Sequence, residues 1–193
     1  MIIDISSYQG VIDWVKVSKS GITKVIHRAT TKDGELDTRL LQNYNGVLQN
    51  MNDTMNQFDV YKFSYERGYI PARIEAVKTM QALSEKGVRF DMLWLDLEGW
   101  GGRDYTKDEA NNVIMGYVDA CIAADVKLGL YFNYNYAKNI VDDIWRVLPL
   151  WIARYNKELG NVSPWRPEIW QYTSSGQIDG IVGNVDISKV VEV

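Results

Sequence analysis

Hydrophobic and polar positions follow two different periods along this chain. Short apolar runs bounded by glycine or polar residues predict strands. These runs cover residues 2–5, 23–30, 58–64, 92–98, 126–133, 150–154, 168–173 and 183–188. Between most of these runs the apolar residues recur at helical spacing, which predicts helices. The helical segments lie near residues 13–21, 38–50, 71–87, 106–121 and 135–147. Thr106 and Glu109, three positions apart, have the form of a capping box that starts the fourth of these helices.

This alternation of the two periods predicts the fold class. Strands that alternate with helices through short connections favour a parallel α/β architecture. A complete eightfold (β/α) barrel typically has about 250 residues, whereas this chain has 193. We therefore predict a single α/β domain over residues 1–193, folded as a reduced or flattened (β/α) barrel with mostly parallel strands.

Polar and aromatic residues fall repeatedly at the ends of the predicted strands. In a (β/α) barrel the carboxyl ends of the strands form one rim, and active sites lie there. The residues that this pattern brings to the rim are Asp4, Tyr61, Asp96, Glu98, Tyr131, Asn133, Arg154, Gln171 and Asp186. Because a closed barrel joins the first and last strands, we expect Asp4 and Asp186 to share a cleft with Asp96.

The strand predicted over residues 92–98 ends in two carboxylates. Side chains alternate between the faces of a strand, so Trp94, Asp96 and Glu98 share one face. The Cα atoms of the two acids lie roughly 6.5–7 Å apart in such a strand. Paired carboxylates in unlike environments are the usual equipment for breaking a glycosidic bond. The alternative is a merely solvated strand end, which the hydrophobic strand and the neighbouring tryptophan disfavour.

Composition narrows the possible functions. The net charge is −4 and the pI is about 5.1, which disfavours nucleic acid as a partner because such proteins normally present a basic face. With one cysteine (Cys121) and one histidine (His27), the common zinc ligand sets cannot be assembled. We therefore expect no metal and no cofactor. No apolar run is long enough to cross a membrane and no basic leader is present, so we expect neither membrane insertion nor a signal peptide.

Several stretches, taken in chain order, resemble one known family, the glycoside hydrolase family 25 lysozymes. Each stretch alone is weakly specific, but together they span the whole chain in the order that the family shows. The stretches are DISSYQG at 4–10 with IDW at 12–14, WLDLE at 94–98, PLWIARY at 149–155, IWQYTS at 169–174, IDGI at 178–181 and VDIS at 185–188.

The resemblance implies a flattened barrel that cleaves the β-1,4 bond between N-acetylmuramic acid and N-acetylglucosamine in peptidoglycan. It implies that Glu98 is the general acid and that Asp96 is its partner. It also maps the outer acids of the family's site onto Asp4 and Asp186. The remaining residues are then expected to bind substrate or to support the site: Tyr61, Lys62, Trp94, Tyr131, Asn133, Arg154 and Gln171.

Two roles are open for Asp96 in a reaction that retains the anomeric configuration. It can attack the anomeric carbon, or it can orient the acetamido group of the substrate so that the acetamido oxygen attacks. Since Asp96 and Glu98 project side by side from one strand, we favour acetamido assistance.

The chain departs from the family's common pattern at two strands. Where Tyr-His-Phe is frequent, this chain has Lys62 between Tyr61 and Phe63. Where a lysine often precedes Ala-Thr, it has Arg28. Both changes place a different group near the rim and concern the details of substrate binding rather than the chemistry.

Two other functions compete with this one. Asp91, Trp94, Asp96 and Glu98 resemble the acidic strand of family 18 chitinases and endo-N-acetylglucosaminidases, but a tryptophan replaces the middle aspartate. A barrel that only binds glycan is the alternative outside the enzymes, and the presence of all the matched acids disfavours it.

The expected partner is the glycan strand of peptidoglycan, acted on by a monomer at the cell wall. The absence of a leader suits a phage endolysin, and it equally suits a secreted bacterial enzyme taken without its signal. No separate wall-binding module is visible in the 193 residues.

Overall fold

The computed structural model describes residues 1–51 and 58–191. In these residues eight strands close a barrel in sequence order. The strands are β1 (Ile2–Ile5), β2 (Lys24–Arg28), β3 (Phe58–Phe63), β4 (Leu93–Asp96), β5 (Leu128–Asn133), β6 (Leu150–Ala153), β7 (Ile169–Gly176) and β8 (Val185–Val190). The predicted α/β barrel with mostly parallel strands is confirmed.

From β1 to β7, consecutive strands pair in parallel. Strand β8 runs the other way and pairs antiparallel with both β7 and β1. The segment between Gly176 and Val185 joins β7 to β8 without a helix. Antiparallel strands do not need the crossover helix that usually joins parallel strands. A barrel is thereby completed in fewer residues than a full (β/α) repeat requires.

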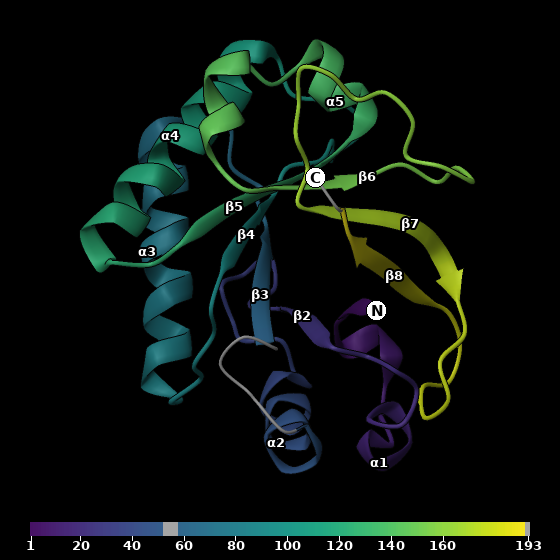
Figure 1. The fold of residues 1–193 in the computed structure, drawn as a ribbon. Coiled ribbons are helices and arrows are strands. Elements are labelled where there is room, and N and C mark those ends of the chain that lie inside the picture. The colour runs from purple at the N-terminus through teal and green to yellow at the C-terminus, as the bar shows by residue number, and fades with distance from the viewer. Residues whose placement is uncertain (52–57, 192–193) are drawn as a thin grey trace.

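The helices cover the barrel unevenly (Figure 1). Their bounds are α1 (Trp14–Val17), α2 (Leu40–Asn50), α3 (Tyr69–Glu85), α4 (Lys107–Ala124) and α5 (Tyr134–Asn139). Helices α3 and α4 pack side by side on one flank, while β7 and β8 lie on the opposite flank. The capping box predicted at the start of α4 is confirmed. The Thr106 hydroxyl oxygen accepts from Glu109 N, and the Glu109 carboxylate accepts from Thr106 N.

Alternation along the strands divides the buried residues into two cores. Leu93, Leu95 and Leu97 belong to the larger core, between the strands and the helices. Trp94 belongs to the second cluster, which fills the barrel interior. The other members of the interior cluster are Ile2, Ile26, Tyr131, Trp151, Ala153 and Ile169. The opposite faces predicted for Trp94 and for the three leucines are therefore confirmed.

The barrel interior is narrow enough to require a glycine beside its largest side chain. A Cβ atom on Gly129 would lie 2.4 Å from the Trp94 ring. The Trp94 indole also packs edge-on against Trp151, with ring centroids 5.9 Å apart. Trp94 and Trp151 therefore form a filled floor beneath the rim.

Three sequence-based boundaries were wrong. The helix predicted over 135–147 is two pieces, α5 and a 3₁₀ helix over Asp143–Val147. Between them Asp142 accepts from Asn111 Nδ2 at 2.6 Å and pairs with Lys107 at 2.7 Å, contacts to α4 that a local pattern does not contain. The strand predicted over 92–98 ends at Asp96, so Glu98 follows β4 rather than belonging to it. The strand predicted over 168–173 continues to Gly176.

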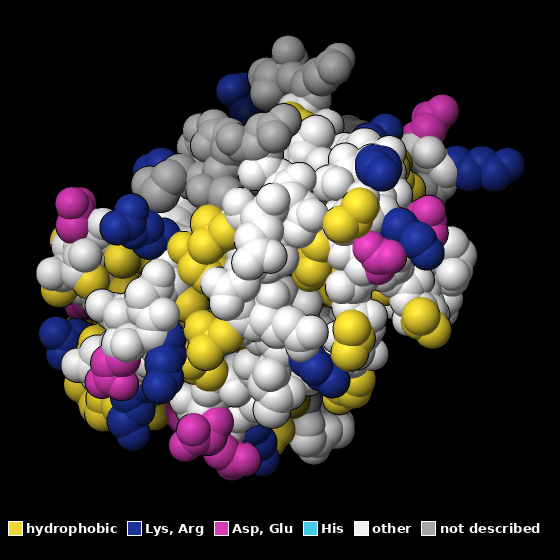
Figure 2. Space-filling view, turned by 90° about the horizontal axis from the view of Figure 1, so that it is seen from below, with side chains coloured by type: hydrophobic (Ala, Val, Ile, Leu, Met, Phe, Trp, Pro, Cys, Tyr) yellow, Lys and Arg dark blue, Asp and Glu magenta, His cyan; other side chains and the backbone are white. Residues whose placement is uncertain are grey.

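The surface carries mixed charge. On the face seen from below Figure 1, acidic and basic side chains lie next to each other rather than in patches of one sign (Figure 2). Within the described ranges, no helix combines the length and apolar character that crossing a bilayer demands.

Candidate active site

Four acids from three parts of the chain meet at one end of the barrel. Asp4 on β1 is the direct cross-strand partner of Asp186 on β8. Asp96 is the last residue of β4, and Glu98 follows two positions later. Charge interactions link all four carboxyls, so they lie within electrostatic reach of one another.

Asp186 reaches this rim by a route that the sequence pattern did not predict. We expected the rim acids at the carboxyl ends of parallel strands, yet Asp186 is the second residue of β8. Because β8 is antiparallel to its neighbours, its first residues lie where the other strands end. Asp186 therefore lies at the rim although it is near the amino end of its strand.

Burial and like charge both favour the protonated forms of the two innermost acids. Asp4 and Asp96 are 8% and 7% exposed. Burial raises the pKa of Asp96 well above its ordinary value, and the charges of Glu98, Asp4 and Asp186 raise it further. Burial and the charge of Asp186 likewise raise the pKa of Asp4, which also hydrogen-bonds to Asp186. Each ionised carboxyl in this group therefore disfavours the ionisation of the others.

Glu98 and Asp186 lie nearer to solvent. Burial raises the pKa of Glu98, and the charge of Asp186 adds to the rise. A hydrogen bond donated by the Tyr131 hydroxyl to the Glu98 carboxylate would lower the pKa of Glu98. Burial also raises the pKa of Asp186, while its hydrogen bond with Asp4 lowers it.

Gln171 joins this group of acids to two tyrosines. Its Oε1 accepts from the hydroxyls of Tyr131 and Tyr155, each at 2.9 Å. Its Nε2 donates to Asp4 Oδ2 at 3.0 Å. Gln171 is 1% exposed, so packing holds this bridge in place. The amide thus engages the Tyr131 proton and orients Asp4.

One oxygen of the Asp96 carboxyl is buried without a hydrogen-bond donor. In residues 1–51 and 58–191, no hydrogen-bond donor reaches its buried Oδ1. A buried carboxylate oxygen without a donor is costly, and such atoms in native proteins call for an explanation. A donor supplied by a bound ligand would satisfy it.

An open cleft adjoins Glu98. It has a volume of about 400 Å³ and is lined by Glu98, Gly99, Gly102, Arg103, Asp104 and Asn133. The loop after β4 supplies all of these residues except Asn133, which ends β5. Glu98 is therefore the rim acid that a ligand in this cleft meets directly.

The other inward-facing residues form the support of the site. The charges of Asp4 and Asp96 raise the pKa of Tyr61 after burial has raised it, so this side chain borders the acids. The Trp94 indole lies in the floor and donates to Asp59 Oδ2 at 3.0 Å. The Tyr131 ring packs against Trp151 at a tilt of 55°, with ring centroids 4.3 Å apart.

Three of the residues expected to bind substrate or to support the site make contacts that hold the surrounding structure. Lys62 lies on the outward side of β3, where Nζ donates to Thr31 O at 2.8 Å and pairs with Glu75 of α3 at 3.4 Å. Arg154 binds the carbonyls of the 159–161 loop and lies over the Tyr134 ring. The Asn133 side chain lines the cleft but also caps α5.

Two residues near the acids escaped the sequence analysis. Tyr155 is 55% exposed, and it directly follows Arg154 in the quoted motif. Asp104 lines the cleft and accepts from the Tyr136 hydroxyl at 3.0 Å. An aromatic residue in a matched motif was a usable signal for Tyr155, whereas nothing local distinguishes Asp104 from an ordinary loop acid.

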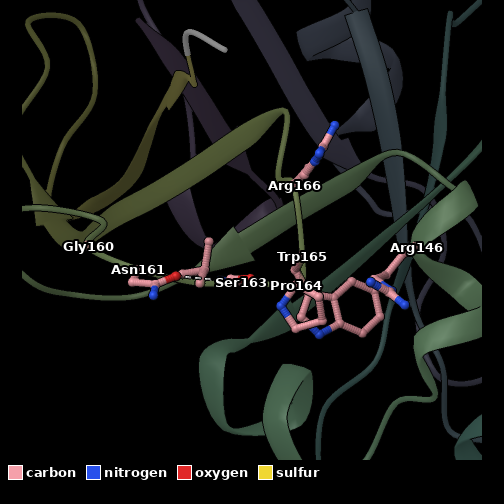
Figure 3. Close-up of a pocket in the computed structure, with 8 residues that line it drawn as sticks. Arg146, Gly160, Asn161, Ser163, Pro164, Trp165 and Arg166 are labelled. Carbon is pink, nitrogen blue, oxygen red and sulfur yellow. Dashed lines mark hydrogen bonds between the residues drawn. The ribbon is translucent and has the colours of Figure 1, made fainter.

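A second cavity lies away from the acids. It has a volume of about 590 Å³ and involves the Gly160–Arg166 loop and Arg146. Asn161 Oδ1 accepts from Ser163 N within this loop. Arg166 points away from Arg146 in the close-up, so their guanidinium groups do not converge on one point (Figure 3). This cavity has no acid pair and does not fit glycosidic chemistry.

Within the described residues, no group of three or more His, Cys, Asp or Glu side chains is arranged to hold a metal ion. The four acids, their tyrosines and Gln171 are therefore the candidate site.

The chain is similar in sequence and fold to several known lysozymes and autolysins. A curated autolytic lysozyme from Clostridium acetobutylicum is 27% identical over 191 residues, which are 98% of this chain and 55% of the relative. Among solved structures, the modular autolysin LytC from Streptococcus pneumoniae, in complex with a synthetic peptidoglycan ligand, has a TM-score of 0.84 at 25% identity. That match covers 97% of this chain and 45% of LytC.

A family 25 glycosyl hydrolase from Bacillus anthracis has the same fold, with a TM-score of 0.80 at 18% identity, over 99% of this chain and 88% of that one. This chain spans about half the length of the curated relative and of LytC. The model of the glycosyl hydrolases family 25 matches residues 3–181. The chain belongs to glycosyl hydrolase family 25.

Proposed function

We propose that this chain is a lysozyme that cleaves the β-1,4 bond between N-acetylmuramic acid and N-acetylglucosamine in peptidoglycan. The observation that carries this proposal is the group of four acids at the rim, where Glu98 opens onto a cleft and Asp96 lacks a protein donor. Family membership supports glycoside hydrolysis, and the names of the lysozyme and autolysin relatives support peptidoglycan as the substrate.

Glu98 acts as the general acid in this proposal. An acid at this position must be protonated to transfer its proton to the leaving oxygen. Tyr131 has a single hydroxyl proton, and Gln171 engages it. The Tyr131 oxygen is therefore free to accept the proton of Glu98, which stabilises the protonated carboxyl. Burial acts in the same direction on the pKa of Glu98.

Asp96 orients the acetamido group of the substrate. The N–H of that group is a donor of the kind that the Asp96 Oδ1 lacks. With the N–H held by Asp96, the acetamido carbonyl oxygen attacks the anomeric carbon while Glu98 protonates the departing glycosidic oxygen. The products of this step are a cyclic oxazolinium ion and the released sugar hydroxyl.

Water completes the reaction. The ionised Glu98 takes a proton from a water molecule, whose oxygen attacks the anomeric carbon and reopens the oxazolinium ring. The acetamido group is restored, Glu98 is reprotonated, and two inversions give net retention. Asp4 and Asp186 lie beside Asp96 and Glu98 and bind sugar hydroxyls.

The test is digestion of purified peptidoglycan, followed by borohydride reduction and mass spectrometry. A muramidase yields fragments that end in muramitol. Fragments that end in glucosaminitol would instead indicate the glucosaminidase activity of the family 18 alternative. No new reducing ends would indicate a barrel that only binds glycan.

A second experiment tests the role of Asp96. Peptidoglycan that has been de-N-acetylated at muramic acid should be a poor substrate, and a thiazoline that mimics the cyclic intermediate should inhibit. A covalent sugar trapped on Asp96 with a fluorinated substrate would show direct attack by the carboxylate instead.

Residues 1–193 act as one monomeric catalytic unit on the cell wall in this proposal, either as a secreted bacterial enzyme or as an endolysin. The barrel supports a single unit, because its closure joins β1 to β8. Light scattering at several protein concentrations tests the monomer.

A further inference from the structure

The rim also carries basic and aromatic side chains, which lie beside its acids and next to Glu66. The acids lie on or just after β1, β4 and β8. Beyond the ends of β2 and β3 lie Lys32, Tyr65 and Arg67, next to Trp100 from the loop that follows Glu98. Tyr65 and Trp100 pack edge-on, with ring centroids 5.7 Å apart, and are here called the aromatic shelf.

The aromatic shelf borders the cleft that contains Glu98. Trp100 forms a β-bridge with Arg103, and Arg103 lines that cleft together with Glu98. A group bound over the shelf would therefore be attached to, or adjacent to, a sugar bound in the cleft.

Most cations around the shelf already have carboxylate partners. Arg67 and Arg103 pair with Glu109. Lys62 pairs with Glu75. These cations are held by carboxylates of α3 and α4, and the single charge of Glu109 serves both arginines.

Lys32 differs from these cations. Its Nζ lies 5.2 Å from the Trp100 ring centroid and 5.7 Å from that of Tyr65. Among residues 1–51 and 58–191, no carboxylate lies within ion-pair distance of it, and its side chain is exposed. Aromatic faces attract an ammonium group without neutralising it. Lys32 is thus a positioned cation without an ion pair among the described residues, although it shares a cavity with Asp33, Glu66 and Glu75.

We propose that Lys32 on the aromatic shelf is a subsite for a carboxylate of the peptide stem attached to the muramic acid of the substrate. This inference rests on the proposed function, and it concerns which peptidoglycan the site prefers. Stem peptides carry free carboxylates close to the sugar, and the cleft that binds the sugar adjoins the shelf. An ammonium that is fixed beforehand loses less freedom on binding than a mobile one.

The test compares Lys32→Gln with the unchanged protein on two substrates. One is native peptidoglycan, and the other is the same material after acetylation of its amines and carbodiimide amidation of its carboxyls. Lys32→Gln should lower kcat/KM about three- to fivefold on native material, the range of an exposed ion pair, and should change nothing on amidated material. Lys32→Arg should retain activity on both.

Lys86→Gln is the matched control, because Lys86 is exposed and follows α3 at the other end of the barrel. It should have no effect on either substrate. An equal loss for Lys32→Gln on both substrates, or no loss on native material, would overturn the proposal. A loss confined to strands stripped of stems by an amidase would assign the anion to the lactyl carboxylate and would also overturn it.

A binding measurement separates this inference from the proposed function. In a Glu98→Gln background, co-sedimentation with insoluble native peptidoglycan should weaken about three- to fivefold when Lys32→Gln is added, and binding to amidated peptidoglycan should not change. If the unchanged protein released no reducing ends, the proposed function would fail while this measurement still decided the role of Lys32.

Discussion

Two buried aspartates in the same barrel interior have opposite surroundings. Asp59 on β3 is 0% exposed and Asp96 on β4 is 7% exposed. Asp59 lies in the floor, where its Oδ2 accepts from Lys24 Nζ at 2.9 Å and from the Trp94 indole at 3.0 Å. Asp96 lies at the rim, where three other acids surround it. Within the described ranges the Oδ1 atoms of both aspartates lack a protein donor, so the difference lies in the donors to Asp59 Oδ2 and in the neighbouring charges.

The comparison shows that burial alone does not identify a functional acid. Burial raises the pKa of Asp59, but Lys24 and Trp94 oppose the rise. Burial raises the pKa of Asp96 well above its ordinary value, and three acids add to the rise. A buried acid supplied with a cation and a donor stabilises the fold, whereas one left among like charges is available to a substrate.

The largest expected effect separates the rim from the floor by activity. Glu98→Gln keeps the shape of the side chain and removes the transferable proton. We expect kcat on purified peptidoglycan to fall by about 10²–10⁴-fold, the usual contribution of a general acid, with the melting temperature unchanged. Release of reducing ends measures the rate.

Asp104→Asn is the control for Glu98→Gln, because Asp104 lines the same cleft and accepts from Tyr136. Its kcat should stay within about tenfold of the unchanged protein, below the contribution of a general acid. Equal losses in the two variants would mean that the cleft needs negative charge rather than a specific acid.

The next largest effect concerns the contribution of Asp59, in the floor of the barrel, to the stability of the fold. Asp59→Ala leaves the buried Trp94 N–H without an acceptor and Lys24 without its partner. We expect a loss of about 1–3 kcal/mol in the free energy of unfolding, the cost of an unpaired buried donor. Urea unfolding measures it. Activity per folded molecule should be retained, and a selective loss of kcat would place Asp59 in the catalytic machinery.

A smaller effect concerns the link between Gln171 and Glu98. Gln171→Leu frees the Tyr131 proton to donate to ionised Glu98, which lowers the pKa of Glu98. The proposed mechanism needs Glu98 protonated, so activity should fall as pH rises through that pKa. We therefore expect the basic limb of the pH–rate profile to move to lower pH by roughly half a unit to one unit.

Two further variants make this test specific. Tyr155→Phe removes the other hydroxyl on Gln171 but leaves the Tyr131 contact, so the profile should not move. Adding Tyr131→Phe to Gln171→Leu removes the freed donor and should reverse the shift. A basic limb that stays fixed in Gln171→Leu would contradict the proposed proton arrangement.

Local patterns predicted much of the fold. Short apolar runs located all eight strands of the described residues, and the Thr106–Glu109 spacing predicted the start of α4. Local patterns do not show in which direction a strand runs or which of its side chains point into the barrel. Nothing in the 183–188 segment states that β8 runs antiparallel, because its direction is set by pairing with β1 and β7.

The same limit applies to the candidate site. The acids were found because each lies at or next to a strand end. Tyr61 and Lys62 were both expected at the rim, yet neighbours in a strand face opposite sides, so only one could point inward. The link between Gln171 and Asp4 spans 167 positions in the sequence. Only closure of the barrel brings them together.

The measurement that tests the contrast most directly is the free energy of unfolding of Asp96→Ala beside Asp59→Ala, from pH 4 to pH 8. An acid whose pKa is raised by folding costs nothing below its unfolded value, near 4, and costs progressively more as pH rises toward its folded value. Removing Asp96 therefore removes a cost that grows with pH.

At pH 7 we expect Asp96→Ala to be as stable as the unchanged protein or more stable, by up to about 1 kcal/mol, although its activity is lost. The advantage over the unchanged protein should shrink toward pH 4, while Asp59→Ala should be destabilised at pH 7. A loss of stability in Asp96→Ala at pH 7 as large as that in Asp59→Ala would contradict the account, because Asp96 would then be held by the fold in the same way as Asp59.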